Sequence, residues 1–499
     1  MAAALQLQFP ADQLYNLYRV APEIILGFFG ILVMLAEPFL PAAKKHVSAW
    51  LALLGGIAAL ASLELVSWYR GPAYGGLMRA DDFSIFVHAI VIVVFILVTL
   101  GSVQYLDNER LQRGEFYALL LFATAGMGIL AGSGELITAF LGLEMSSISS
   151  YILCGFRRNA EKSNESSLKY FLLGSFATAF FLYGIAMIYG ATGTTRFDQL
   201  QTIISQSGSL APLLVIGMAL MLVGLGFKVV AAPFQIYAPD VYEGAPTPVT
   251  AVLASAPKAA TFALLLRILY TAFGANNNLW FWAIWISAIL SMCIGNFAAL
   301  VQTNVKRMLA YSSIAHAGYI LVGFAASSMI GVAAVLFYLA AYALMKLGAF
   351  LVVTQLGGPE ERRLEIRDYA GLGVQQPALA ACFSLFLLSL LGLPATGGFL
   401  GKFYAFQAAL QTGGELGAHG HMFTWLVVVA ALNSVVGAYY YLRVIVSMYF
   451  WDPQTEFKPL RVTPAIATAL TIAAIGTIYL GIFPTSVMHY ALLSALSLK

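Results

Sequence analysis

Four ionisable side chains lie inside stretches that are otherwise apolar enough to cross a membrane: Glu144, Lys228, Lys258 and Lys402. A charged group at the centre of a bilayer costs roughly 3 kcal/mol or more, so it must face other helices or water. Acids and lysines in such positions commonly mark the path of a proton or an ion. These residue types therefore predict proton transfer within the membrane.

Two of these lysines lie beside residues that break helices. Lys228 is followed by Pro233, and Lys402 follows a Gly392-Leu393-Pro394 break. Interrupted helices with polar groups near the midplane are typical of transporter sites. The string before Lys402 is not a phosphate loop, because position 396 is Thr where that motif has Gly and position 403 is Phe where it has Ser or Thr. A titratable lysine at a membrane-embedded break is the better interpretation.

Each of the four has a structural alternative. Glu144 is about 13 Å from the outer end of its span at the usual helical rise. It is either a relay acid tuned by a basic partner, or a carboxylate that the neighbouring serines or a lysine of another helix hold for packing alone. Lys228 either switches its charge in a cavity or extends its ammonium to the membrane interface. Lys258 follows Pro257 and lies thirty residues after Lys228. It either faces Lys228 across a polar axis as part of a relay or has a structural role.

Lys346 and His316 are second-tier candidates for the same path. Both lie in apolar runs. A histidine titrates near neutrality and could bridge two lysines, although a hydrogen-bonded structural histidine is an equal alternative. The role of Lys346 is inferred from its burial alone.

The connection Ala238–Val249 is the most distinctive string in the chain. Its prolines end one span and begin the next, and Asp240 and Glu243 place acid on a loop without a basic residue of its own. The string predicts a rigid elbow, in which the carboxylates either admit protons or stabilise the loop.

The elements that position these residues are membrane helices. The chain has 499 residues, of which 60% are hydrophobic and 10% charged; an ordinary soluble domain has about 25% charged residues. The fold class is therefore an all-α polytopic membrane protein with about 14 transmembrane helices. The expected spans are 20–40, 47–69, 82–105, 115–132, 135–157, 164–191, 209–237, 246–274, 278–302, 307–326, 329–356, 377–411, 422–450 and 462–484.

No soluble domain is expected, because the longest polar connections, 192–208 and 357–376, are too short to bury a core. The whole chain, 1–499, is predicted to be a single transmembrane domain. A weak internal symmetry divides it into a first repeat over 114–274 and a second over 278–450, each with one Pro-interrupted helix and a lysine. Helices at 20–105 and 462–484 flank the repeats.

The basic residues predict the orientation. Alternate connections hold fourteen lysines and arginines on one side against five on the other, which places both termini outside by the positive-inside rule. The net charge of +3 is too small to indicate a nucleic-acid partner. We expect no removable signal peptide at Met1–Tyr18. Cys154, Cys293 and Cys382 lie in apolar runs with no spacing suited to a disulfide, zinc or iron–sulfur site.

Four strings carry a resemblance to a known family: Ala238–Thr250, Pro257–Leu266, Lys306–Gly318 and Gly392–Phe403. They resemble the antiporter-like membrane subunits of respiratory complex I, which are related to Mrp-type cation/proton antiporters, and within that family the subunit N group is most similar. The resemblance implies fourteen helices in two inverted five-helix repeats, with broken helices at 209–237 and 377–411. It also implies that Glu144, Lys228, Lys258 and Lys402 transfer protons.

The function implied is proton translocation in a bacterial inner membrane, driven by electron transfer from NADH to quinone in other subunits. The resemblance implies no cofactor in this chain, with FMN, iron–sulfur clusters, NADH and quinone bound by partner subunits. Its partners would be those subunits, lipid, protons and internal water. A cation/proton antiporter or its subunit is the main alternative, and a structural scaffold is a third that leaves the buried charges unexplained.

Overall fold

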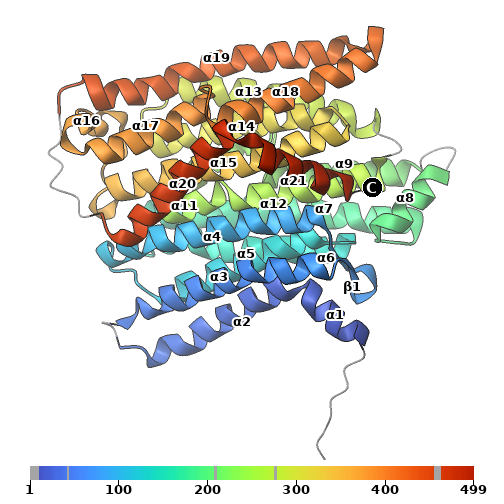
Figure 1. Ribbon diagram of the computed structural model, residues 1–499, viewed down its shortest axis with the longest axis horizontal. Helices are drawn as coiled ribbons and strands as arrows, with labels where there is room; N and C mark the ends of the chain where they lie inside the picture. The colour runs from blue at the N-terminus through green and yellow to red at the C-terminus, as the bar shows by residue number, and fades with distance from the viewer. Residues whose placement is uncertain (1–10, 42–43, 207–210, 275–277, 454–461, 499) are drawn as a thin grey trace, which may run out of the picture.

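The computed structural model describes residues 11–41, 44–206, 211–274, 278–453 and 462–498. Long helices run side by side along one direction and make up nearly all of this part of the chain (Figure 1). The strands in the described part are β1 (Gly71–Ala73) and β2 (Met78–Ala80), which pair antiparallel in a small hairpin. This architecture confirms the all-α membrane fold.

Twelve stretches in the described part are long and apolar enough to cross a membrane. Asp81, Glu135, Asn304 and Ser328 cap four of their helices by accepting a hydrogen bond from a first-turn backbone N–H. Eleven of the stretches contain one main helix each: α2 (Ala21–Ala36), α3 (Val47–Trp68), α4 (Asp82–Asn108), α5 (Gly114–Gly132), α6 (Leu136–Cys154), α7 (Glu161–Thr192), α13 (Asn278–Leu300), α14 (Val305–Ala325), α15 (Met329–Leu356), α19 (His421–Phe450) and α20 (Pro464–Ile482).

Two broken helices complete the expected set of fourteen spans. The first is α9 (Pro212–Lys228), after which the chain turns and continues as the short helices η4 (Gln235–Tyr237) and α10 (Ala238–Gly244). The second is α17 (Pro377–Leu391) with α18 (Gly397–Glu415), separated by Gly392, which has a φ of 99°. Both breaks were expected from the prolines.

The span expected over 246–274 is also interrupted, which the sequence interpretation did not foresee. It consists of α11 (Thr247–Leu253), α12 (Ala256–Arg267) and a π-helical turn at Ile268–Ala272. Pro257 has no N–H to offer the carbonyl of Leu253. The hydroxyl of Tyr242 donates to that carbonyl at 3.0 Å instead. The break is thus satisfied by a side chain from the elbow.

Two helices lie outside the expected spans. The connection at 192–208 contains an amphipathic helix, α8 (Phe197–Gln206), whose buried side is formed by Phe197, Leu200 and Ile204. The chain also continues past the last expected span as α21 (Pro484–Leu496). Ser494 and Ser497 of this final segment bond to the backbone at the start of α4. Contacts with a helix distant in sequence therefore order the C-terminal segment.

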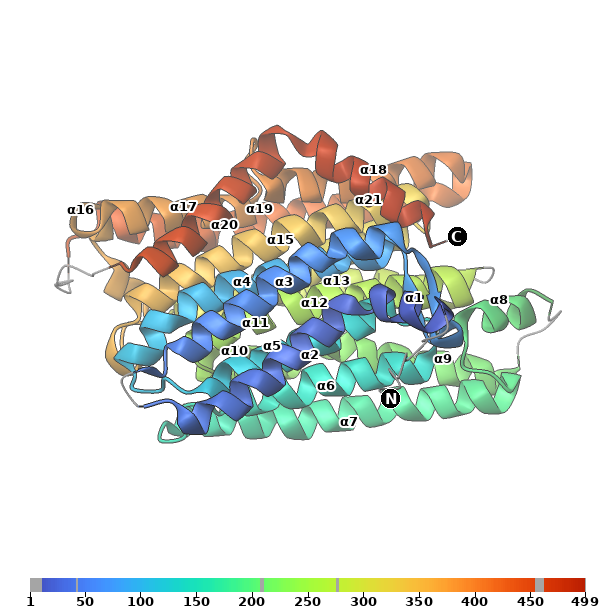
Figure 2. The same cartoon turned by 60° about the horizontal axis from the view of Figure 1, so that its bottom comes forward.

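The ends of the bundle differ. The first described helix, α1 (Ala11–Arg19), lies at the same end as α8 and the C-terminus, on the right in Figure 1, and α16 (Leu372–Gln375) lies at the other end. In Figure 2, α6 and α7 form one edge of the bundle and α17–α21 form the opposite edge. Helices α12, α14 and α15 lie between these edges and are buried on nearly all sides. The division into two inverted repeats stays a prediction.

Cys154, Cys293 and Cys382 are free thiols, of which Cys154 is buried and the other two are partly buried. Their assignment to the packed interior is confirmed for Cys154.

Candidate functional site

Lys228 is the last residue of α9 and is buried where that helix ends. Its ammonium donates to the Ser147 hydroxyl at 2.6 Å and to the Tyr151 hydroxyl at 3.2 Å, both on α6. It also lies 5.1 Å from the ring centre of Tyr151 and 5.4 Å from that of Tyr170. Hydroxyls and the faces of two aromatic rings therefore hold this cation.

Glu144 lies on α6, one turn before Ser147. No ion pair within 4 Å joins Glu144 to Lys228, although both residues are described, and Oε1 of Glu144 is buried without a hydrogen-bond partner. The carboxylate still acts electrostatically on Lys228. The expected pair of Glu144 and Lys228 is therefore not a direct ion pair, because the Lys228 ammonium donates its hydrogen bonds to the hydroxyls of Ser147 and Tyr151.

Lys258 lies on α12 and is fully buried. Its ammonium donates to the backbone carbonyl of Ser313 at 2.7 Å and lies 5.2 Å from the ring centre of Tyr342. The hydroxyls of Ser313 and Tyr342 share a hydrogen bond of 2.7 Å. Lys258 therefore contacts α14 and α15, whereas Lys228 contacts α6 and α7, so the two lysines do not face each other directly as expected.

Lys346 and His316, the second-tier candidates, are joined by a chain of hydrogen bonds. The Lys346 ammonium donates to the carbonyl of Leu309 at 2.6 Å and to the Ser312 hydroxyl at 2.9 Å. Ser312 shares a short hydrogen bond with the Tyr441 hydroxyl, which lies 3.2 Å from Nε2 of His316. The bridge runs from Lys346 through two hydroxyls to the imidazole.

The other nitrogen of His316 continues this chain. Its Nδ1 lies 2.9 Å from the Tyr338 hydroxyl. His316 also lies within electrostatic range of Lys258, Lys346 and Lys402. The histidine is bonded to two tyrosines where a bridge between two lysines was expected, and it sits among three lysines.

Lys402 lies in the second turn of α18, after the Gly392 break. Its ammonium donates to the carbonyl of Leu391 at 2.8 Å and to the Ser434 hydroxyl at 2.9 Å, and it lies 4.7 Å from the ring centre of Tyr319. Leu391 is the last residue of α17, whose exposed C-terminal carbonyls attract a cation. The break therefore creates a cation-binding position inside the membrane.

One face of α14 connects three of these lysines. Ser312 bonds to Lys346, Ser313 bonds to Lys258, and the ring of Tyr319 lies against Lys402. His316 lies between them on the same helix. Three lysines, a histidine and several hydroxyls thus form a polar core along α14, and a group of this kind can carry protons between its members.

The elbow carboxylates are paired with bases from other helices. Asp240 contacts Lys169 and Arg307 at 2.7 Å each, and Glu243 contacts Lys162 and Arg307 at 3.0 Å each. Partial burial would raise the pKa of both acids, but hydrogen bonds and charges from these bases lower it. The geometry favours the loop-stabilising alternative over proton admission.

Sequence reasoning missed several buried charges. Arg267 pairs with Asp81 through two hydrogen bonds of 2.7 and 2.8 Å, and His88 contacts Glu23 at 2.7 Å. Burial would raise the pKa of Asp81, but the Arg267 charge and bonds from Ser84 lower it. Arg267 and His88 each interrupt an apolar run, the same signal that identified Lys258.

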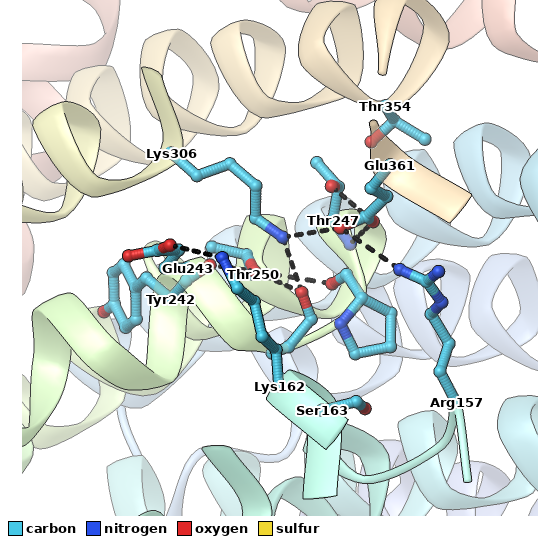
Figure 3. A network of polar contacts seen from close by, with 12 residues as sticks. Arg157, Lys162, Ser163, Tyr242, Glu243, Thr247, Thr250, Lys306, Thr354 and Glu361 are labelled. Carbon is cyan, nitrogen blue, oxygen red and sulfur yellow. Dashed lines mark hydrogen bonds and ion pairs between the residues drawn. The ribbon is translucent and has the colours of Figure 1, made fainter. Parts of the chain in front are cut away.

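Lys306 is one of the fourteen basic residues that the prediction of orientation assigned to inside connections, but it is fully buried in α14. Its ammonium donates to Oε2 of Glu361 at 2.9 Å and to the carbonyl of Ala245 at 2.6 Å (Figure 3). Glu361 comes from the connection after α15, so local sequence gave no signal that the two would meet.

Known proteins are similar to this chain over nearly its whole length. A family profile described as NADH:quinone oxidoreductase/Mrp antiporter, TM, matches residues 133–430. NADH-quinone oxidoreductase subunit N 1 of Solibacter usitatus is 48% identical over 98% of this chain and 99% of its own length. A chain in the structure of respiratory complex I from Thermus thermophilus with bound aureothin is 36% identical, with a TM-score of 0.79 over 94% of this chain and 98% of that one.

A chain of the Mrp complex from Dietzia sp. has a TM-score of 0.84 over 97% of both chains, at 20% identity. That likeness shows a shared fold.

Proposed function

Because the chain belongs to the NADH:quinone oxidoreductase/Mrp antiporter membrane family, we propose that it is the proton-translocating subunit N of a proton-pumping NADH:quinone oxidoreductase in a bacterial inner membrane. The relatives that are similar over nearly the whole chain support this assignment. The antiporter alternative is supported only by a likeness of fold. The other subunits of the complex are then its partners.

The observation that carries the proposal is the polar core along α14. A scaffold would gain nothing from three buried lysines, since replacing buried charges by apolar side chains is often neutral or stabilising. Here each ammonium has a hydroxyl, a carbonyl or an aromatic ring as its partner, with no carboxylate within 4 Å of Lys258, Lys346 or Lys402 in the described part of the chain. Such lysines can lose their protons without breaking an ion pair.

In the proposed mechanism, quinone reduction in other subunits changes the electrostatic field around Glu144 and Lys228. Lys228 then passes a proton through water to Lys258, and the α14 core passes it on to Lys402, which releases it outside. The direction depends on two states that differ in charge placement, and this chain makes or breaks no covalent bond other than those to the proton.

The redox chemistry belongs to the partner subunits in this proposal, where FMN, iron–sulfur clusters, NADH and quinone would bind. Both termini would lie on the periplasmic side. The shared location of α1 and the C-terminus at one end of the bundle supports a common side for the termini, and the loop charges support its identity.

The test is Lys258→Met in the assembled complex. Methionine keeps the volume of the stem and removes the charge. We expect proton uptake per NADH oxidised by inverted membrane vesicles to fall at least tenfold. Lys44→Met is the matched control, since that lysine is exposed and lies in the connection before α3, outside the α14 core. Normal uptake in Lys258→Met vesicles would contradict the proposed function.

A further inference from the structure

Glu361 is a carboxylate from a connection that is buried among three helices. Its Oε1 accepts hydrogen bonds from the Tyr105 hydroxyl at 2.8 Å and from Thr247, through the backbone N–H at 2.7 Å and the hydroxyl at 2.6 Å. Its Oε2 accepts from Lys306 at 2.9 Å and lies 3.6 Å from Arg157 (Figure 3). Glu361, from the connection after α15, thus contacts α4, α11 and α14.

One charged cavity reaches this carboxylate, and a second cavity shares Arg157 with the first. The first, of about 470 Å³, is lined by Glu361, Arg157, Lys162 and Glu243, among others. The second, of about 560 Å³, is lined by Arg157 and Glu109, among others. Cavities of this size with charged walls hold many waters, since one water needs only about 30 Å³. Glu361 therefore lies between water at the inner end of the bundle and the buried lysines.

The membrane side of the pair leads to the α14 core. Lys306 is bonded to Glu361, and the carbonyl of Leu309, three residues further along α14, accepts from Lys346. Three residues advance a helix by about 4.5 Å. The ammonium of Lys346 is thus anchored one turn deeper than Lys306, and it opens the hydrogen-bonded chain to His316.

The alternative for Glu361 is a purely structural role, in which its ion pair with Lys306 only holds the connection in place. A buried ion pair is a weak source of stability, because desolvation of both charges offsets their attraction. A structural ion pair also needs no contact with water, whereas the Glu361 carboxylate lines a cavity and is bonded to Lys306. The position between a charged cavity and the polar core is what a proton inlet requires.

We propose that Glu361 and Lys306 form the inlet through which protons from the inner aqueous side reach Lys346 and the α14 core. This inference rests on the proposed function. Lys306 gives its proton through water to neutral Lys346. Glu361 then takes a proton from cavity water and passes it to Lys306, which restores the ion pair. One proton leaves the water, one reaches Lys346, and the charge of the pair is unchanged after each cycle.

The electrostatics favour this order of steps. Burial would raise the pKa of Glu361, but the Lys306 charge, the bonds from Thr247 and the Arg157 charge lower it. Loss of the proton from Lys306 removes the largest of the lowering influences, so Glu361 becomes a better proton acceptor at that moment. The groups facing the pair are Tyr105 of α4, Glu109 directly after α4, Arg157 after α6 and Glu243 of α10.

The experiment compares Glu361→Gln, Glu361→Asp and Glu415→Gln in the assembled complex. Glu415 is the matched control, because it is an exposed acid at the end of α18 that lines neither cavity, whereas the side chain of Glu361 is 6% exposed. Inverted vesicles turn the inner side toward the medium, so the pH of the medium titrates the inlet. NADH oxidation and proton uptake are measured together from pH 5.5 to 8.5.

We expect Glu361→Gln to lower proton uptake per NADH at least fivefold, Glu361→Asp to restore part of it with a shifted pH profile, and Glu415→Gln to match the wild type. Wild-type uptake in Glu361→Gln at every pH overturns the inlet. Where Glu361→Gln does not assemble, Glu361→Asp decides: a pH profile shifted by about half a unit or more supports the inlet, and a profile that superimposes on the wild type overturns it.

Lys258→Met separates this inference from the proposed function. If Lys258→Met abolishes uptake while Glu361→Gln leaves it intact, only the inlet fails. If Lys258→Met pumps normally, the proposed function fails and the inlet fails with it.

Discussion

The buried ion pair between Asp81 and Arg267 provides a quantitative prediction about stability. It joins the start of α4 to the end of α12 through two hydrogen bonds of 2.7 and 2.8 Å. The Arg267 side chain is 2% exposed, and that of Asp81 is 17% exposed. We predict that removing the acid is more harmful than removing the base, because only the acid can regain water in place.

The magnitudes follow from what each variant leaves behind. Asp81→Asn keeps the cap of α4, since asparagine caps as well as aspartate, but it leaves the Arg267 charge buried and unpaired, at a cost of about 3–5 kcal/mol. Asp81→Ala also removes the cap and costs about 1 kcal/mol more. Arg267→Met leaves Asp81 bonded to Ser84 and partly hydrated, so we expect a cost below about 3 kcal/mol.

The assay heats the purified complex carrying a fluorescent tag on this chain and measures the fraction of tagged chain that stays soluble. A shift of about 2–4 °C per kcal/mol applies to chains of 150–250 residues, so we expect roughly half of that here. Asp81→Asn should lower the midpoint by about 3–10 °C. Asp81→Asn/Arg267→Met should be milder than Asp81→Asn alone, because no charge remains unpaired.

Two results would refute this reasoning. A larger loss in Arg267→Met than in Asp81→Asn would show that the arginine acts through packing of its stem and not through its charge. A double variant as unstable as the sum of both single variants would show that the two residues do not interact.

Four further predictions concern the proton path and the elbow. Lys228→Arg should assemble but lose proton pumping, because arginine stays protonated. Full pumping in this variant would show that Lys228 is only a fixed charge. Tyr151→Phe, which removes one hydroxyl partner of Lys228, should lower the rate of proton pumping about 2–10-fold. Ser312→Ala should likewise slow NADH-driven proton uptake about 2–10-fold, since it removes the hydroxyl between Lys346 and the imidazole chain; an unchanged rate would exclude this hydroxyl from the path. Amide hydrogen exchange over 238–244, corrected for its intrinsic rate, should stay constant from pH 7 to 5 and accelerate only below about pH 4. The ion pairs lower the pKa values of Asp240 and Glu243, so the stabilisation by these carboxylates is lost only as the pH falls through their lowered pKa values. Acceleration near pH 6 would contradict these ion pairs.

Properties that depend on local sequence were predictable. The apolar runs fixed the membrane spans, because a bilayer accepts only segments that satisfy their own backbone. Pro233 and Pro394 predicted two broken helices, since proline removes a helical hydrogen bond wherever it lies. The burial of Lys228, Lys258 and Lys402 and the partial burial of Glu144 followed from their apolar neighbours. The break before Pro257 carried the same local signal and was overlooked.

The partners of these residues were decided only by tertiary packing. His316 meets Tyr441, which lies 125 residues away along the chain, and Glu361 meets Thr247 across 114 residues. Sequence spacing carries no information about such contacts, because they depend on how helices pack side by side. Lys306 shows most clearly what local sequence does not predict. Its position at the start of a helix is typical of a solvated loop. It is buried because the connection after α15 folds over the start of α14 and places Glu361 against it.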